Sequence, residues 1–129
     1  MSNLIKIAFK ISNDKKGVSL VGKSTDSETG LTRAACNDFL HWFIPEDNDI
    51  VGASVAFRGA SPFENNLLLL RWDQTTRYVL AEPFCVTWGA AGQLFDYNYC
   101  ITVRTDNRQP RADVFFLGTG SLHIDPLPI

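Results

Sequence analysis

The stretch NLLLLRWDQTTRYVLAEPFCVTWGAAGQLFDYNYCITVRT, residues 66–105, decides the fold class of this chain. It contains three apolar and β-branched runs, which are separated by the short turn segments 73–76 and 89–92. Runs of this length between turn residues are typical of β-strands. The sequence therefore predicts an antiparallel meander here.

The first turn fixes a register in which Trp72 lies opposite Arg77, so that Leu70 meets Val79. Apolar residues then face apolar residues, whereas a slip of one residue would move every side chain to the opposite face. Residues 67–70 are apolar at every position. We therefore expect this strand to be covered on both faces.

The second turn predicts a register in which Val86 meets Phe95. In the same register Cys85 and Cys100 lie four residues apart along the ladder, about 13 Å at the rise of a strand. A disulfide requires Cα atoms within about 7 Å. The three cysteines, an odd number, are therefore expected to be reduced thiols.

The remaining strands follow from the alternation of apolar and polar residues. Ile7 and Phe9 share one predicted face of the first strand. Gly118 and Gly120 predict a break near the end of the chain. The further predicted strands span residues 4–11, 18–22, 51–57, 114–117 and 122–124.

Residues 31–44 fit two structures. Leu31, Ala35 and Phe39 recur at helical spacing, and Pro45 would end a helix, so a short helix is expected over residues 32–40. Residues 40–44 fit a strand equally well. Residues 1–129 are thus expected to form a single all-β domain, an antiparallel sandwich or barrel of about eight strands with this one helix.

Composition excludes several classes of partner. The formal net charge is −2 and the isoelectric point is about 5.6, which argues against nucleic-acid binding. The longest aliphatic run, residues 67–70, is too short to form a transmembrane segment. The first residues lack the basic and apolar regions of a signal peptide. We therefore expect a cytoplasmic protein, or one released without a conventional signal.

Sequence motifs favour binding over catalysis, with a small enzyme that has a scattered site around His41 or His123 as a further alternative. The chain has no phosphate-binding loop, no nucleophile elbow and no closely spaced cysteine pair. With only His41 and His123, no metal and no cofactor are expected. His41 is expected to be neutral and hydrogen-bonded at the margin of the core, and His123 to lie on an outer face.

Aromatic and polar residues near the two turns are typical of a carbohydrate site, because a sugar ring packs on a flat aromatic face and bonds planar polar groups. The sequence therefore predicts a lectin-like, non-catalytic ligand-binding module. The expected ligand-binding residues are Arg71, Trp72, Asp73, Arg77, Trp88, Asp96, Asn98 and Arg104.

An alternative function follows from the strand at 51–57, whose outer face carries only Gly52, Ser54 and Ala56. Small residues permit close approach of another surface, so a self-assembling, homo-oligomeric or partner-binding protein of toxin-related or inclusion type is also expected. The segment 122–126 is similar to the end of bacterial inclusion-body proteins. That similarity covers one short stretch and assigns no family.

Overall fold

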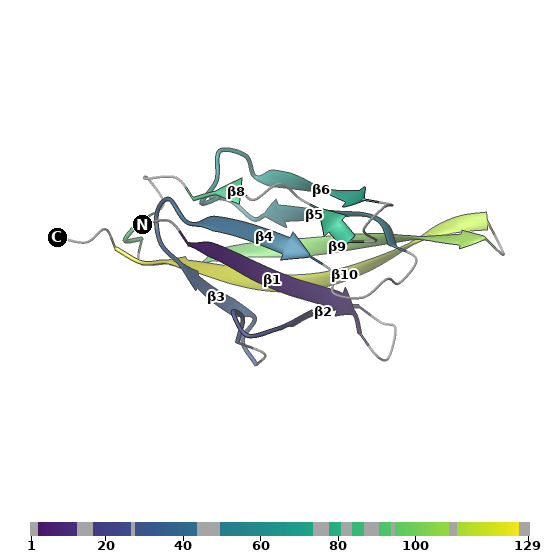
Figure 1. Ribbon diagram of the computed structural model, residues 1–129, viewed down its shortest axis with the longest axis horizontal. Helices are drawn as coiled ribbons and strands as arrows, with labels where there is room; N and C mark the ends of the chain where they lie inside the picture. Colours follow the sequence, from purple (N-terminus) through teal and green to yellow (C-terminus); the bar gives the residue numbers. More distant parts are fainter. Residues whose placement is uncertain are drawn as a thin grey trace.

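The computed structural model describes residues 3–12, 17–26, 28–43, 50–73, 78–80, 84–86, 91–93, 95–108 and 111–126. Within these residues the chain is all β, which confirms the expected class, and it contains no helix that could cross a membrane. Its ten strands form two sheets, so the strand number is close to the expected eight (Figure 1).

The smaller sheet has four strands in the order β2-β1-β4-β8. Their bounds are Val18–Val21 for β2, Leu4–Ile11 for β1, Phe39–Phe43 for β4 and Phe84–Cys85 for β8. The larger sheet has six strands in the order β3-β10-β9-β5-β6-β7. Their bounds are Leu31–Ala34, Arg111–Ile124, Tyr97–Arg108, Ile50–Phe57, Leu67–Asp73 and Tyr78–Leu80 in the same order.

Both sheets are mixed, so the prediction of a wholly antiparallel fold is wrong. β1 runs parallel to β4, and β10 runs parallel to β3. These partners are distant in the chain, and the alternation of residues within a strand does not encode the direction of its neighbour. β2 and β8 remain edges of one sheet, and β3 and β7 remain edges of the other, so the described strands do not close into a barrel.

A single core lies between the two sheets. Ile7 and Phe9 on β1 point into it as predicted, and Trp42 on β4 joins them. Val55 and Ile101 meet them from β5 and β9 of the larger sheet. All five side chains are fully buried, so one apolar cluster joins both layers.

The predicted helix over 32–40 is wrong, because a turn divides this segment into β3 and β4. Asn37 has a left-handed backbone with φ of 67°, which is incompatible with a continuous helix. The buried Asp38 carboxylate accepts hydrogen bonds from the backbone N–H of Asn3 at 3.0 Å and of Ala35 at 2.9 Å. These bonds replace those that a helix would have supplied.

The first predicted hairpin forms, but its register differs from the expected one by two residues. Trp72 pairs with Val79 rather than lying opposite Arg77. A shift of two residues leaves each side chain on its original face, so apolar matching alone does not separate the two registers.

The second predicted pairing, between residues 84–88 and 93–97, is wrong. β8 pairs with β4, whereas β9 pairs with β10 and β5. The Val86 N–H donates to the Asp38 carbonyl, and the Val86 carbonyl accepts from the Asn37 N–H. The turn before β4 therefore uses the backbone groups that the predicted hairpin required. The thiols of Cys36 and Cys100 are free.

The predicted break at Gly118 and Gly120 is also wrong, because β10 runs through both residues. A side chain at Gly118 would collide with the carbonyl of Val18, and one at Gly120 with the hydroxyl of Tyr99. The glycines therefore let neighbouring groups approach a continuous strand instead of ending it.

Candidate functional site

The outer face of the larger sheet carries two rows of side chains that cross four strands. The first row joins partners in register and runs Leu69, Ser54, Thr102, Leu117. The second row lies one pleat away and runs Leu67, Ala56, Cys100, Thr119. We call these eight residues the open face. β6 and β10 supply its outer positions, and β5 and β9 its centre.

Large apolar side chains on the open face are unusually exposed. Leu67 and Leu69 on β6 are 55% and 68% exposed, and Leu117 on β10 is 58% exposed. Phe115, next to this face on β10, is 60% exposed. The prediction that residues 67–70 are covered on both faces is therefore wrong. Leu68 and Leu70 are buried, whereas their neighbours face solvent.

The centre of the open face is low because its residues are small. Serine, alanine, cysteine and threonine occupy the positions on β5 and β9, so leucines on β6 and β10 stand above them. Gly52 continues this strip, and the guanidinium of Arg104 lies over it, with Nη2 3.7 Å from the position that a β-carbon would take. Small residues on β5 and β9, which we call the trough, thus lie between larger residues on β6 and β10, which we call the ridges.

Two of the predicted ligand-binding residues, Asn98 and Arg104, lie on the outer side of β9, and a third, Asp96, directly precedes the strand. An Asp96 carboxylate oxygen lies 3.0 Å from Nδ1 of His123, and the Asn98 side-chain oxygen lies 2.6 Å from the Ser121 hydroxyl. Arg104 is eight residues from Asp96, roughly 26 Å along a strand. These side chains would therefore contact separate parts of a ligand rather than surround one sugar ring.

The partners of Asp96 and Asn98 are His123 and Ser121 of β10. The sequence did not point to them, because β10 lies beside β9 only in the folded chain. His123 lies on the outer side of the sheet as expected, and its Nε2 lies 3.8 Å from Asp125. A carboxylate oxygen of Asp125 in turn lies 3.6 Å from Nη1 of Arg33. In the part of the chain that the structure describes, no three His, Cys, Asp or Glu side chains form a group suited to a metal ion.

The other predicted ligand-binding residues cannot be placed as a site. Arg71, Trp72 and Asp73 form the end of β6, and only their backbone positions belong to the described structure. Arg77 and Trp88 lie outside the described residues. The carbohydrate site expected around the two tryptophans therefore stays a prediction.

His41 lies on β4 beside Lys6 of β1. Partial burial, aided by the positive charge of Lys6, lowers the pKa of His41 below its usual 6.5. A lowered pKa favours the expected neutral form. The expected hydrogen bond is not seen, since the buried Nε2 of His41 finds no partner among the described residues.

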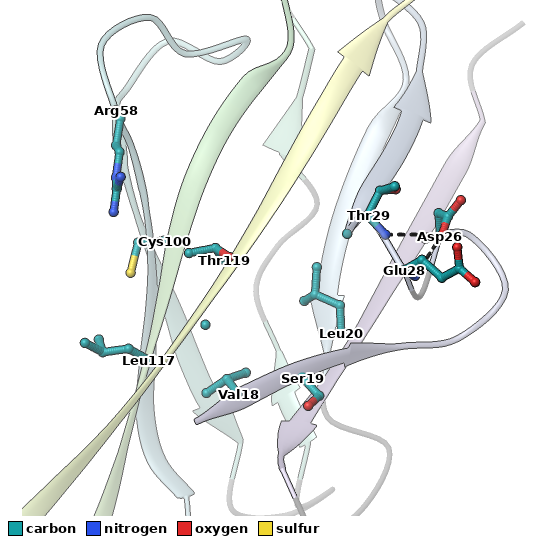
Figure 2. Close-up of a pocket in the computed structure, with 12 residues that line it drawn as sticks. Val18, Ser19, Leu20, Asp26, Glu28, Thr29, Arg58, Cys100, Leu117 and Thr119 are labelled. Carbon is teal, nitrogen blue, oxygen red and sulfur yellow. Dashed lines mark hydrogen bonds between the residues drawn. The ribbon is translucent and has the colours of Figure 1, made fainter. Parts of the chain in front are cut away.

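A groove of about 520 Å³ runs along β10, on the side where β2 approaches it. Figure 2 shows Arg58, Cys100 and Leu117 on one side and Asp26, Glu28 and Thr29 on the other. The Asp26 carboxylate is held in place by the backbone N–H groups of Glu28 at 2.8 Å and Thr29 at 3.3 Å. Both charged and apolar groups therefore line the groove.

Comparison of the chain with protein-family models, with curated proteins and with solved structures found no match.

Proposed function

We propose that this protein acts by binding another protein surface through its open face, and that it is not an enzyme. One observation carries the proposal, namely that large apolar side chains on both ridges are more than half exposed. Single exposed leucines are normal on soluble proteins, but a contiguous apolar patch marks an interaction surface. In this proposal the two sheets form a β-sandwich, with one outer face reserved for a partner.

Energetics favour covering this face. Each leucine that leaves water contributes about 1.5–3 kcal/mol. The two rows of the open face contain no charged side chain, and the nearest charge, the Arg104 guanidinium over Gly52, lies at the end of the strip, so a partner that covers the rows alone removes no ion from water. The hydroxyls of Ser54 and Thr102 lie in the trough, where they can bond to a partner's backbone.

Site-specific photocrosslinking tests this proposal. A photoreactive residue at position 69 should form a protein adduct in an extract of cells that express the chain. Leu4 on β1 is 53% exposed and belongs to the other sheet, so the same residue at position 4 is the matched control. Absence of an adduct at position 69, or equal adducts at both positions, would contradict the proposal.

The groove favours a second candidate function, the binding of a small polar ligand such as a sugar. Its volume of about 520 Å³ lies within the range of roughly 300–1,000 Å³ that is typical of ligand sites. Arg58 offers planar donors, and Glu28 offers an acceptor. A glycan array that gives signal with the wild-type chain and none with Arg58→Ala would support this function, and a silent array would remove it.

The free thiols of Cys36 and Cys100 bear on where the protein acts. Free, partly exposed thiols persist in a reducing compartment. They support the proposal that the protein works in the cytoplasm, or that it is released from there without a conventional signal.

A further inference from the structure

The positive charge of this chain is distributed unevenly along the sequence. All five lysines lie within residues 6–23, and Asp14 is the only acidic residue in that range, so residues 1–24 carry a formal charge of +4. The seven arginines and the thirteen other acidic residues give the remainder a formal charge of −6. The net charge of −2 is therefore an average, and it leaves room for a local basic surface that attracts a polyanion.

The fold places this basic segment on the smaller sheet. β1 and β2 form an antiparallel pair, and β1 lies directly beside β4 (Figure 1). Ile7 and Phe9 of β1 are fully buried in the core. Because successive residues of a strand point to opposite faces, Lys6 and Lys10 point to the outer face of the sheet. This outer face therefore carries a row of lysines.

Aromatic rings lie beside these lysines. Phe39, His41 and Phe43 occupy alternate positions of β4, and we call them the aromatic row. Leu40 and Trp42 between them are fully buried, so the aromatic row also points to the outer face. Its positions are about 6.7 Å apart along the strand, and the ring centroids of His41 and Phe43 are 6.2 Å apart. Phe39 at the start of the row is 38% exposed.

The lysines and the aromatic row are in register. Lys6 lies opposite His41, and Leu4 lies opposite Phe39. Partial burial and the charge of Lys6 lower the pKa of His41, so the field of Lys6 reaches the aromatic row. None of the described residues on the outer face of β1, β2 and β4 is acidic. The face is thus positive as well as aromatic.

We infer that the outer face of the smaller sheet binds a single-stranded nucleic acid. The bases of a single strand stack on aromatic rings, while ammonium groups neutralise the phosphates of its backbone. Adjacent strands of this sheet supply both groups, with the aromatic row on β4 and the lysines on β1. The inference goes beyond the proposed function, because the open face belongs to the other sheet.

The aromatic row favours a single strand over other polyanions. In a duplex the bases stack on one another, so their faces are not available to protein rings. An anionic lipid surface would attract the lysines, but its headgroups offer no planar partner for the rings. Only a strand with unstacked bases uses both the charge and the rings.

Fluorescence anisotropy of the full chain tests the inference. The probe is a labelled oligouridylate of about 12 nucleotides, within the site sizes of roughly 4–16 nucleotides known for such surfaces. Its affinity should fall roughly 15–20-fold between about 50 mM and 200 mM salt, as expected when about three phosphates are neutralised. A duplex RNA of the same length should bind at least ~10-fold more weakly, because its bases cannot stack on the rings.

Two variants separate stacking from charge. Phe39→Ala should weaken binding at least ~5-fold without changing the salt dependence, because it removes a stacked ring and no charge. Lys6→Gln should weaken binding and reduce the slope of log affinity against log salt by about 0.7. Phe115→Ala and Arg33→Gln change exposed side chains of the larger sheet, so both should bind like the wild type.

A second measurement does not depend on the variants. An oligouridylate that carries one 5-iodouridine should crosslink to the wild-type chain under ultraviolet light. The attachment, mapped by mass spectrometry, should fall within Phe39–Phe43 or Leu4–Ile11. A crosslink confined to the larger sheet would contradict the inference.

Each remaining outcome decides the inference. Absence of binding at about 50 mM salt with protein at ~1 mM overturns it. Binding that Phe39→Ala and Lys6→Gln leave unchanged, or equal affinity for the duplex, also overturns it. So does binding to phosphatidylserine vesicles without binding to the oligouridylate. None of these results bears on the proposed function, which the crosslink at position 69 tests on the other sheet. Circular dichroism of each variant checks that it is folded.

Discussion

The indole N–H of Trp42 donates a hydrogen bond to the Tyr99 hydroxyl at 3.4 Å, across the space between the two sheets. Their rings meet edge to face, with centroids 5.6 Å apart. Trp42 belongs to the smaller sheet and Tyr99 to the larger one, so this pair joins the two layers at the centre of the core.

Alkaline pH should destabilise the fold through Tyr99. Burial raises the pKa of Tyr99 to about 12, from 10.0 for a free tyrosine. The unfolded chain therefore loses this proton first, and the stabilising contribution, present in full below pH 10, is lost as the pH rises toward 12. The free energy of unfolding should fall by about 2–3 kcal/mol over this pH range. Urea unfolding between pH 8 and about 12 measures it.

Tyr99→Phe is the control for this prediction. The substitution removes the titrating hydroxyl, so it should cost about 1 kcal/mol at pH 7 but flatten the alkaline part of the stability curve. Burial also raises the pKa of Tyr97 above 10.0, but the last of the three tyrosines to titrate in the absorbance at 295 nm should be Tyr99, and that last step should vanish in the variant. A late step that persists would assign it to Tyr78 or Tyr97.

Acid pH should destabilise the fold through His41. Burial and Lys6 lower the pKa of His41 in the folded state below 6.5. The unfolded chain therefore binds a proton first, and the stability present above about pH 6.5 declines as the pH falls through the folded-state pKa. His41→Gln should flatten this decline. Thermal unfolding between about pH 7.5 and pH 5 compares the two proteins, and parallel curves would refute the assignment.

The buried Asp38 carboxylate should be one of the largest single polar contributions to stability. It accepts two backbone N–H groups, and Asp38→Ala would leave them without that acceptor, at a cost of about 2–4 kcal/mol. Asp26 is a matched control, because its carboxylate also accepts two backbone N–H groups but is exposed to solvent. Asp26→Ala should cost less than about 1 kcal/mol. Similar urea unfolding midpoints for Asp38→Ala and Asp26→Ala would show that burial of the carboxylate does not increase its contribution to stability.

Gly120 should not tolerate a side chain. A methyl group there would collide with the Tyr99 hydroxyl, and the Tyr99 ring is held by Trp42 and Phe57. Gly120→Ala should therefore cost about 2–3 kcal/mol. Gly52→Ala is the control, since its methyl would contact only the Arg104 side chain at an ordinary 3.7 Å, and it should change stability by less than about 0.5 kcal/mol. Differential scanning calorimetry compares the two.

Local alternation predicted the parts of this fold that depend on one strand at a time. It placed Ile7 and Phe9 in the core, and it identified the strand at 51–57 with its small outer face. Periodicity failed where a tertiary contact decides the structure. The helical spacing of residues 31–40 is overridden by the Asp38 carboxylate, whose partner Asn3 is 35 positions away.

The candidate site was only half visible in the sequence. The strip of small residues Gly52, Ser54 and Ala56 can be recognised within one strand, and it predicted a contact surface. The ridges on either side of this strip cannot be recognised in the sequence. Leu69 and Leu117 become neighbours of the strip only through the registers of four strands. Apolar residues in a strand are also expected inside, so their exposure has no signature in the sequence.

The position of β10 in the larger sheet has a consequence for how the chain is made. β10 lies between β3 and β9, although β3 leaves the ribosome about 90 residues before β10 is complete. Before β10 is synthesised, β3 has no hydrogen-bonded strand in its sheet, and one edge of β9 has no strand partner. Nascent chains should therefore depend on chaperones, and a stalled chain that ends before β10 should be an early target of proteases.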